Sequence, residues 1–166
     1  MNNTAVLKID SKTLIVDAIL LGFMLIVPAL SHLVGLPLRA IEPMRMALLA
    51  GMLLVNDRRN AYLLAVLLPV VSTLMTGFPA GAKCMLMVVE MLANVAIFSL
   101  LNHRLNVWAS MAIAIVLSKA VYYGLKVLVF GSLVMTTPWY TQLLVVLGFS
   151  IAYAVFYANK DKSLTE

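Results

Sequence analysis

Charged residues are scarce in this chain: Asp, Glu, Lys and Arg make up 11% of its 166 residues, whereas hydrophobic residues make up 63%. Soluble domains usually hold about 25% charged and about 45–50% apolar residues. The mean hydropathy of +1.02 reflects the same excess of apolar side chains. The composition therefore predicts an integral membrane protein, and it leaves no length for a separate soluble catalytic domain.

Motifs of enzymes and cofactor sites are also missing. Cys84 is the single cysteine, which excludes an internal disulfide and a thiolate metal cluster. Neither the ATP-binding pattern GxxxxGKS/T nor the zinc motif HExxH occurs. The net charge is +5, but the basic residues are scattered around apolar stretches, where they set membrane orientation. We therefore expect no catalytic residue, no metal, no cofactor and no nucleic-acid partner.

What the sequence does contain is a series of apolar stretches separated by short polar breaks. A helix needs about 20 apolar residues to cross a bilayer. The predicted spans are 13–35, 39–56, 61–77, 82–102, 106–130 and 139–158. The sequence thus predicts an all-α integral membrane protein, a compact bundle of six transmembrane helices. This single domain covers residues 1–166, with short tails at about 1–12 and 159–166.

The orientation follows from the basic residues, because cytoplasmic loops carry an excess of Lys and Arg. One side of the predicted bundle collects Lys8, Lys12, Arg58, Arg59, Arg104, Lys160 and Lys162. Both termini are on this side and are expected to be cytoplasmic.

Charged residues inside the spans are the candidates for function, because each costs at least about 2.5 kcal/mol at the centre of a membrane helix. They are Glu42, Arg45, Lys83, Glu90, Lys119 and Lys126, with Arg39 just before the second span. Helical spacing places Lys83, Glu90 and Asn94 on one face of the fourth span. The predicted topology puts nearly all of these residues in the outer half of the bilayer.

These charges predict an outward-facing ligand cavity. The cluster has five cations (Arg39, Arg45, Lys83, Lys119, Lys126) and two anions (Glu42, Glu90), an excess of three that favours a ligand with a carboxylate, a phosphate or several acceptors. Aromatic residues such as Tyr123 and Trp139 would stack on a flat ring. Two alternatives stay open. An internal network, Glu42 with Arg45 or Glu90 with Lys119, would only hold the bundle together, and Trp139 would belong to the interfacial aromatic belt.

The first span carries a different feature. Ala18 and Gly22 are four residues apart, and small residues at this spacing let another membrane helix approach closely. If used, this face would dock a partner helix and would not bind a ligand.

Taken together, six spans, cytoplasmic termini, small residues spaced by four and outward polar groups resemble the substrate-binding S component of an energy-coupling factor (ECF) transporter. The stretch STLMTGFPAGAKCMLMVVEM, residues 72–91, is similar to the third-loop region of several S components. The docking motif of the family is Ala-xxx-Ala. This chain has Gly22 in the second position of the motif, which departs from the family pattern but keeps the small surface.

The resemblance implies a subunit in the inner (plasma) membrane of a prokaryote that captures a vitamin or related micronutrient from outside. It would then tilt when coupled to a transmembrane T component and two cytoplasmic ATPases. The family's ligand positions correspond here to Arg39, Lys83, Glu90, Asn94, Lys119, Tyr123 and Trp139. The charge argument adds Glu42 and Arg45 to the predicted ligand-binding residues. Biotin, thiamine, riboflavin, folate, pyridoxine and others all stay open.

Two other functions fit a small multispan chain. One is a non-enzymatic scaffold resembling the rod-shape protein MreD, which would use the same helices for partner contacts. The other is a small lipid-modifying enzyme that uses Glu42 or Glu90. Charge in the outer half of the bilayer favours uptake over the scaffold.

Overall fold

The structure is a computed structural model that describes residues 11–34, 42–55, 57–77, 79, 81–131 and 139–163. These residues form six α-helices and no β-strand. The helices are α1 (Ser11–Val34), α2 (Pro43–Val55), α3 (Arg58–Thr76), α4 (Ala82–Leu101), α5 (Val107–Phe130) and α6 (Trp139–Ser163). The predicted all-α fold class is therefore confirmed for the described part of the chain.

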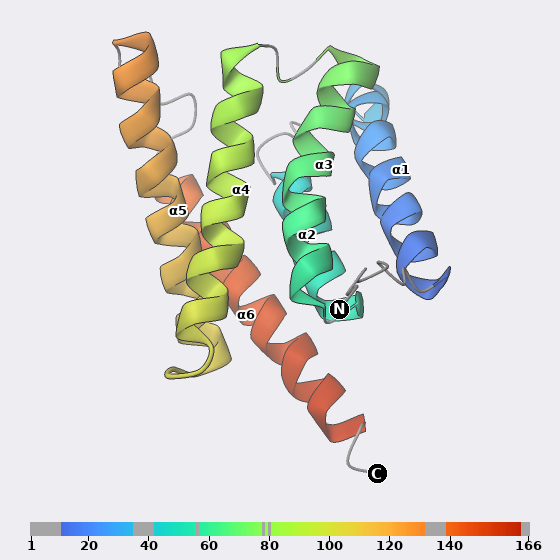
Figure 1. Ribbon diagram of the computed structural model, residues 1–166, viewed down its shortest axis with the longest axis vertical. Coiled ribbons are helices and arrows are strands. Elements are labelled where there is room, and N and C mark those ends of the chain that lie inside the picture. Colours follow the sequence, from blue (N-terminus) through green and yellow to red (C-terminus); the bar gives the residue numbers. More distant parts are fainter. Residues whose placement is uncertain are drawn as a thin grey trace, which may run out of the picture.

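Helices that follow one another in sequence pack side by side (Figure 1). In addition, α1 contacts α3 and α2 contacts α6. α1 begins and α6 ends at the same end of the bundle, where α2 also leads to α3 and α4 leads to α5 (Figure 1). We call this end, around Asp57 and Asn102, the basal end. The opposite end, around Thr76 and Ala82, is the apical end.

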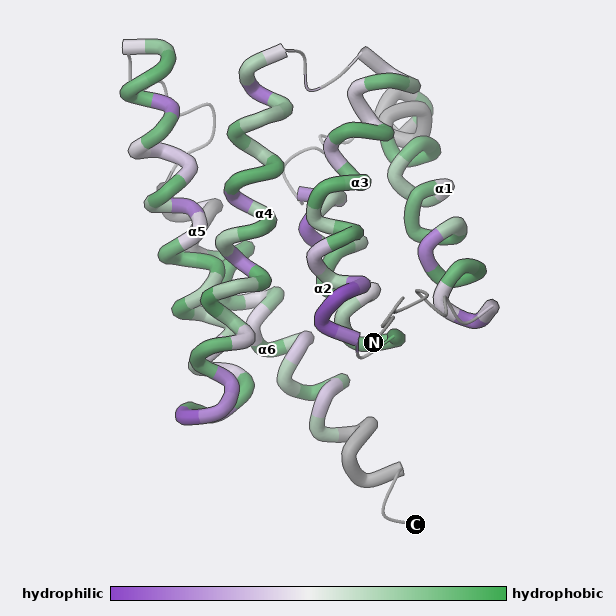
Figure 2. Tube along the Cα trace, in the orientation of Figure 1, coloured by the Kyte–Doolittle hydropathy of each residue, from purple (hydrophilic) through white to green (hydrophobic). Residues whose placement is uncertain are grey.

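Three of the helices, α3, α4 and α5, are long and apolar enough to span a membrane. Figure 2 shows hydrophobic residues along most of their length. α2 has only 13 residues, and at 1.5 Å per residue it is about 20 Å long. It is therefore shorter than a bilayer's hydrocarbon core, which measures roughly 30 Å. α6 contains a shorter apolar stretch, Leu144–Ala158.

Two helices extend beyond the predicted spans by three residues or more. α3 begins at Arg58, before the predicted start at 61, because Asp57 caps it: the Asp57 carboxylate accepts a hydrogen bond from the Arg59 backbone N–H at 2.9 Å. α6 continues to Ser163, beyond the predicted end at 158. The predicted start of the second span, 39–41, lies outside the described residues.

Two buried apolar clusters form the core, and α2 contributes to both. The first includes Leu20, Leu48, Leu64, Leu68, Met91 and Val95, from α1, α2, α3 and α4. The second includes Leu49, Phe98, Met111, Ile115, Val146 and Tyr153, from α2, α4, α5 and α6. Because Leu48 and Leu49 enter different clusters, the short helix α2 joins the two halves of the core.

Gly51 allows α2 to pack closely against its neighbours. A Cβ atom added there would collide with Cδ1 of Leu64 in α3 and lie 3.2 Å from Cδ1 of Leu20 in α1. Leu64 has no exposed surface, so a larger residue at position 51 would require its buried side chain to shift.

A valine at Gly51 should destabilise the bundle, because it overpacks a buried contact at a typical cost of about 1–3 kcal/mol. The matched control is Gly124→Val in α5, where no described atom lies within 4 Å of an added Cβ. Both variants place a β-branched residue in a helix, so the propensity terms cancel. We expect a lower thermal unfolding temperature in detergent for Gly51→Val than for Gly124→Val, and equal temperatures would contradict the close packing.

Candidate functional site

Four charged side chains from three parts of the chain meet between α2, α4 and α5. Glu42 immediately precedes α2, Arg45 lies in its first turn, Glu90 is in α4 and Lys119 is in α5. Arg45 pairs with Glu90 and also with Glu42, at 3.1 Å between Nε and Oε2. Lys119 pairs with Glu42, and its Nζ lies 3.9 Å from Oε1 of Glu90. We call Glu42, Arg45, Glu90 and Lys119 the ion cluster.

The ion cluster is buried unevenly. The exposed fraction of the side chain is 4% for Arg45 and 8% for Glu90, but 14% for Lys119 and 29% for Glu42. Removing a charge from water costs several kcal/mol unless a partner compensates it. Arg45 and Glu90, the two most buried members, therefore depend most on a charged partner. Glu42 and Lys119 form the more exposed side of the ion cluster.

The ion cluster lies well below the apical end of the bundle. Glu90 follows Ala82, the first residue of α4, by eight residues, which is about 12 Å along the helix axis. Figure 2 shows hydrophilic bands part-way along α4 and α5, between hydrophobic turns. Arg45 reaches this depth because α2 begins next to the middle of α4.

Glu42 adopts an unusual backbone conformation. Its φ angle is +50°, in the left-handed region that non-glycine residues rarely occupy. Such a conformation costs about 1–3 kcal/mol and persists only where the surroundings impose it. Pro43 then starts α2, a position that suits proline because no helical hydrogen bond needs its missing N–H. The Glu42 carbonyl accepts from the backbone N–H groups of Arg45 (2.9 Å) and Met46 (3.2 Å), which fixes the strained residue to the helix.

Three buried polar atoms at this site have no hydrogen-bond partner among the described residues. They are Nη1 of Arg45, a donor, and two acceptors, Oδ1 of Asn94 and Oε2 of Glu42, although Oε2 of Glu42 lies in the ion pair with Nε of Arg45. Asn94 lies one turn after Glu90, and its Nδ2 donates to Oγ of Ser118 at 3.4 Å. A buried polar atom left unpaired costs about 1–3 kcal/mol. Nη1 of Arg45 thus lacks an acceptor, and Oδ1 of Asn94 lacks a donor, among the described residues.

The structure brings together several of the residues predicted from sequence. Glu42, Arg45, Glu90 and Lys119 form the ion cluster, and Asn94 lies beside it on α4. The pairs predicted for an internal network, Glu42 with Arg45 and Glu90 with Lys119, are both present and belong to one cluster. Ser118, which had no predicted role at this site, is the partner of Asn94.

Other predicted residues lie further from the ion cluster or outside the described part of the chain. Tyr123 packs edge-on against Tyr122, with 5.4 Å between ring centroids, and Nζ of Lys126 lies 6.0 Å from the Tyr123 centroid. Lys83 is in the first turn of α4, about 10 Å along the helix from Glu90. Arg39 lies outside the described residues. So does the side chain of Trp139, which begins α6.

The charge of the ion cluster differs from the tally made on the sequence. Arg45 and Lys119 balance Glu42 and Glu90, so the cluster sums to zero. The sequence tally included Lys126, which is about 10 Å along α5 from Lys119. Sequence spacing groups residues by helix face, and it does not show which of them reach the same depth on different helices.

The predicted docking face on α1 is open. Ala18 is exposed and Gly22 is partly exposed, and no described atom lies within 4 Å of the position a Cβ would take at Gly22. The rest of the described chain therefore leaves this small-residue face uncovered.

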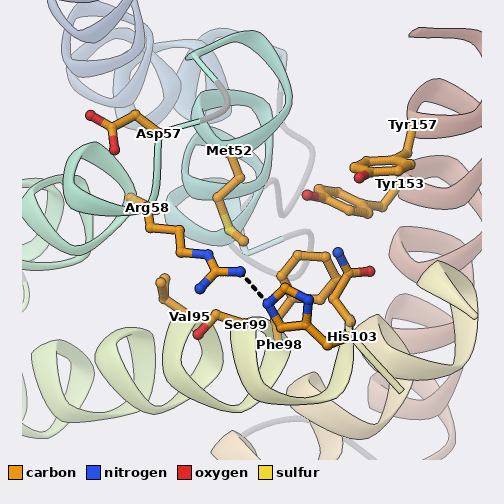
Figure 3. A pocket seen from close by; sticks show the side chains of 11 residues that line it. Met52, Asp57, Arg58, Val95, Phe98, Ser99, His103, Tyr153 and Tyr157 are labelled. Atoms are coloured by element: carbon orange, nitrogen blue, oxygen red, sulfur yellow. Dashed lines mark hydrogen bonds between the residues drawn. The ribbon is translucent and has the colours of Figure 1, made fainter. Parts of the chain in front are cut away.

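A cavity of about 490 Å³ lies at the basal end, away from the ion cluster. Figure 3 shows Arg58 and His103 facing Tyr153 and Tyr157 across it, with Met52 between them. The Arg58 guanidinium donates a hydrogen bond to Nε2 of His103. Sequence analysis treated Arg58 only as a topology signal, because nothing in its spacing places it opposite α6. The four-residue spacing of Tyr153 and Tyr157, on one helix face, was the available signal.

Comparisons with known proteins found no match to this chain. No protein-family model matches the sequence, and no curated protein or solved structure shows significant similarity to it. Among the described residues, no group of three or more His, Cys, Asp or Glu side chains is arranged to hold a metal ion. The functional argument therefore depends on the geometry of the chain itself.

The coupling between Arg45 and Glu90 is measurable by a double-mutant cycle. Arg45→Met or Glu90→Met alone leaves a buried charge with too few partners, at an expected cost of about 3–5 kcal/mol. Arg45→Met/Glu90→Met removes both charges and leaves Glu42 paired with Lys119. We expect the double variant to unfold at a higher temperature in detergent than either single variant. Additive losses would contradict the pairing.

Proposed function

We propose that this chain is a membrane-embedded substrate-binding subunit that captures a vitamin or related micronutrient from outside the cell. In this proposal six helices cross the membrane with both termini in the cytoplasm, and ATPases on partner chains supply the energy. The observation that carries the proposal is the ion cluster, which keeps an unpaired donor on Arg45 and leaves Asn94 with an unpaired acceptor nearby. Ionisable groups within a membrane segment are functional candidates by default.

The chemistry of the ion cluster favours a particular kind of ligand. Because the four charges balance, a net anion gains little attraction there, in contrast to the expectation from the sequence tally. Nη1 of Arg45 needs an acceptor and Oδ1 of Asn94 needs a donor. A neutral ring with adjacent carbonyl and N–H groups supplies both, and such rings occur in several vitamins.

The shape of the site supports entry from the apical end. Glu42 and Lys119 are the more exposed members of the ion cluster, and Arg45 is the most buried. A ligand would thus meet Glu42 and Lys119 first. The strained backbone at Glu42 supports a role in binding, because such strain gathers at ligand clamps.

The open face of α1 supports the proposed coupling to partners. Small residues allow close approach of another helix, and Ala18 and Gly22 leave such a surface uncovered. A transmembrane T component would dock there, and two cytoplasmic ATPases would act through it.

The MreD-like scaffold is the second candidate, and one observation favours it. Each charge of the ion cluster already has an opposite partner within the chain, so the cluster is electrostatically complete without a ligand. A scaffold would use the cluster only to fix α2 against α4 and α5. The two candidates differ in whether the site binds a small molecule.

Native mass spectrometry of the detergent-purified chain, with and without a panel of vitamins and their precursors, tests the proposal. We expect one stoichiometric adduct on the wild-type chain. Glu90→Gln should weaken that adduct by about tenfold or more, because Gln changes the charge beside Arg45 with little change in shape.

The matched control is Asp57→Asn at the basal end, which removes one carboxylate and keeps a residue able to cap α3. It should retain the adduct of the wild-type chain. Equal affinity of Glu90→Gln and the wild-type chain would remove Glu90 from the site. A panel with no adduct, together with co-purifying protein partners, would favour the scaffold.

A further inference from the structure

The basal cavity brings cationic and hydrogen-bonding groups from separate helices to one space. Arg58 begins α3, His103 follows α4, and Tyr153 and Tyr157 lie on α6. Met52 and Phe98 supply apolar surface beside them. In Figure 3 the hydroxyl groups of both tyrosines point toward the side of the cavity where Arg58 lies. The volume of about 490 Å³ falls within the usual range for small-molecule sites.

The positive charge of Arg58 is directed into this cavity. One of its five N–H groups donates to Nε2 of His103. The neighbouring carboxylate belongs to Asp57, which also lines the cavity. Oδ1 of Asp57 accepts from the backbone N–H of Arg59 at 2.9 Å, and Figure 3 shows the Asp57 carboxylate turned away from His103. The remaining N–H groups of Arg58 suit an anion with several oxygens.

Asn102 contributes an unpaired hydrogen-bond acceptor to the cavity, whereas Arg58 contributes donors. Its Oδ1 is buried and has no hydrogen-bond partner among the described residues, although Asn102 lines the cavity. An unpaired amide oxygen needs a donor, such as a hydroxyl group. A ligand that satisfies both Arg58 and Asn102 thus carries an anionic group and a hydroxyl group.

We propose that the basal cavity binds an organic phosphate that carries a free hydroxyl group, with the phosphate on Arg58 and the hydroxyl on Asn102. A planar guanidinium binds two phosphate oxygens at once, which favours phosphate over a single-point acceptor. This site is separate from the ion cluster, because the cluster lies beside the middle of α4 and the cavity lies at the basal end. Two sources supply this chemistry: the glycerol headgroup of an anionic phospholipid, and a soluble phosphate ester.

Two experimental arms distinguish these sources. In the first, glycerol 3-phosphate is titrated calorimetrically into the detergent-purified chain. In the second, the chain is placed in nanodiscs of phosphatidylcholine with or without phosphatidylglycerol, and the lipid it retains is identified by native mass spectrometry. Saturable heat in the first arm assigns a soluble ester, and selective retention of phosphatidylglycerol in the second assigns a lipid headgroup. Either result supports the shared chemistry, and absence of both overturns it.

The matched variants are Arg58→Gln and Arg104→Gln. Both remove one positive charge at the basal end, but Arg104 is an exposed residue that does not line the cavity. We expect Arg58→Gln to weaken binding by about tenfold or more, since it loses a charge-assisted hydrogen bond. Arg104→Gln should bind like the wild-type chain. Equal losses in the two variants would indicate diffuse attraction and overturn the site.

Asn102→Asp gives a second result that does not depend on the folding of the Arg58 variant. It keeps the shape of the side chain and adds a negative charge beside the proposed phosphate, so binding should weaken strongly. Unchanged affinity in Asn102→Asp would overturn the assignment of Asn102 and of the cavity.

Discussion

The buried guanidinium of Arg45, held by Glu42 and Glu90, is the interaction on which the arrangement of the helices depends. A cation with 4% of its side chain exposed requires nearby anions, and these come from the start of α2 and the middle of α4. α2 must therefore begin beside the middle of α4. Its 13 residues reach from there to the basal end, and along the way Leu48 and Leu49 join the two apolar clusters.

The ion cluster requires the desolvation of four charged side chains, which has a high free-energy cost. Buried ion pairs often add little stability compared with well-packed apolar residues, so stability alone gives little reason to keep four charges at this depth. The strained backbone of Glu42 and the unpaired atoms of Arg45 and Asn94 add further cost. A ligand that pairs with those atoms would recover part of that cost upon binding. These costs are the reason why we propose that the ion cluster binds a ligand in addition to its role in packing.

Several features were predictable from the sequence because they follow from local rules. Hydrophobic length predicted the helices, and the cost of intramembrane charge singled out Glu42, Arg45, Glu90 and Lys119. Helical spacing placed Asn94 on the same face as Glu90. The predicted second span, 39–56, included Glu42 because it rested on hydropathy, whereas α2 begins at Pro43 after the left-handed Glu42. The composition of the chain does not reveal that a glutamate adopts a left-handed backbone conformation.

The neutral charge of the ion cluster and the basal cavity were not predictable, because both depend on contacts between helices distant in sequence. Arg58 meets His103, which is 45 residues later in the chain, and both lie across the cavity from Tyr153. Counting basic residues predicted a side of the membrane for Arg58 but not its partner. The same limit applies to Ser118, whose contact with Asn94 links α4 to α5.

The central claim is that the ion cluster is reachable by a polar molecule from one side of the membrane. Cysteine accessibility in sealed, oriented vesicles tests it, with Glu42→Cys in a Cys84→Ala background and a membrane-impermeant charged thiol reagent. Val116→Cys, on an exposed part of α5 within the apolar span, is the control that should not react. The account predicts that Glu42→Cys reacts from the outer side only. Labelling from neither side would contradict it and leave the ion cluster as a closed structural network.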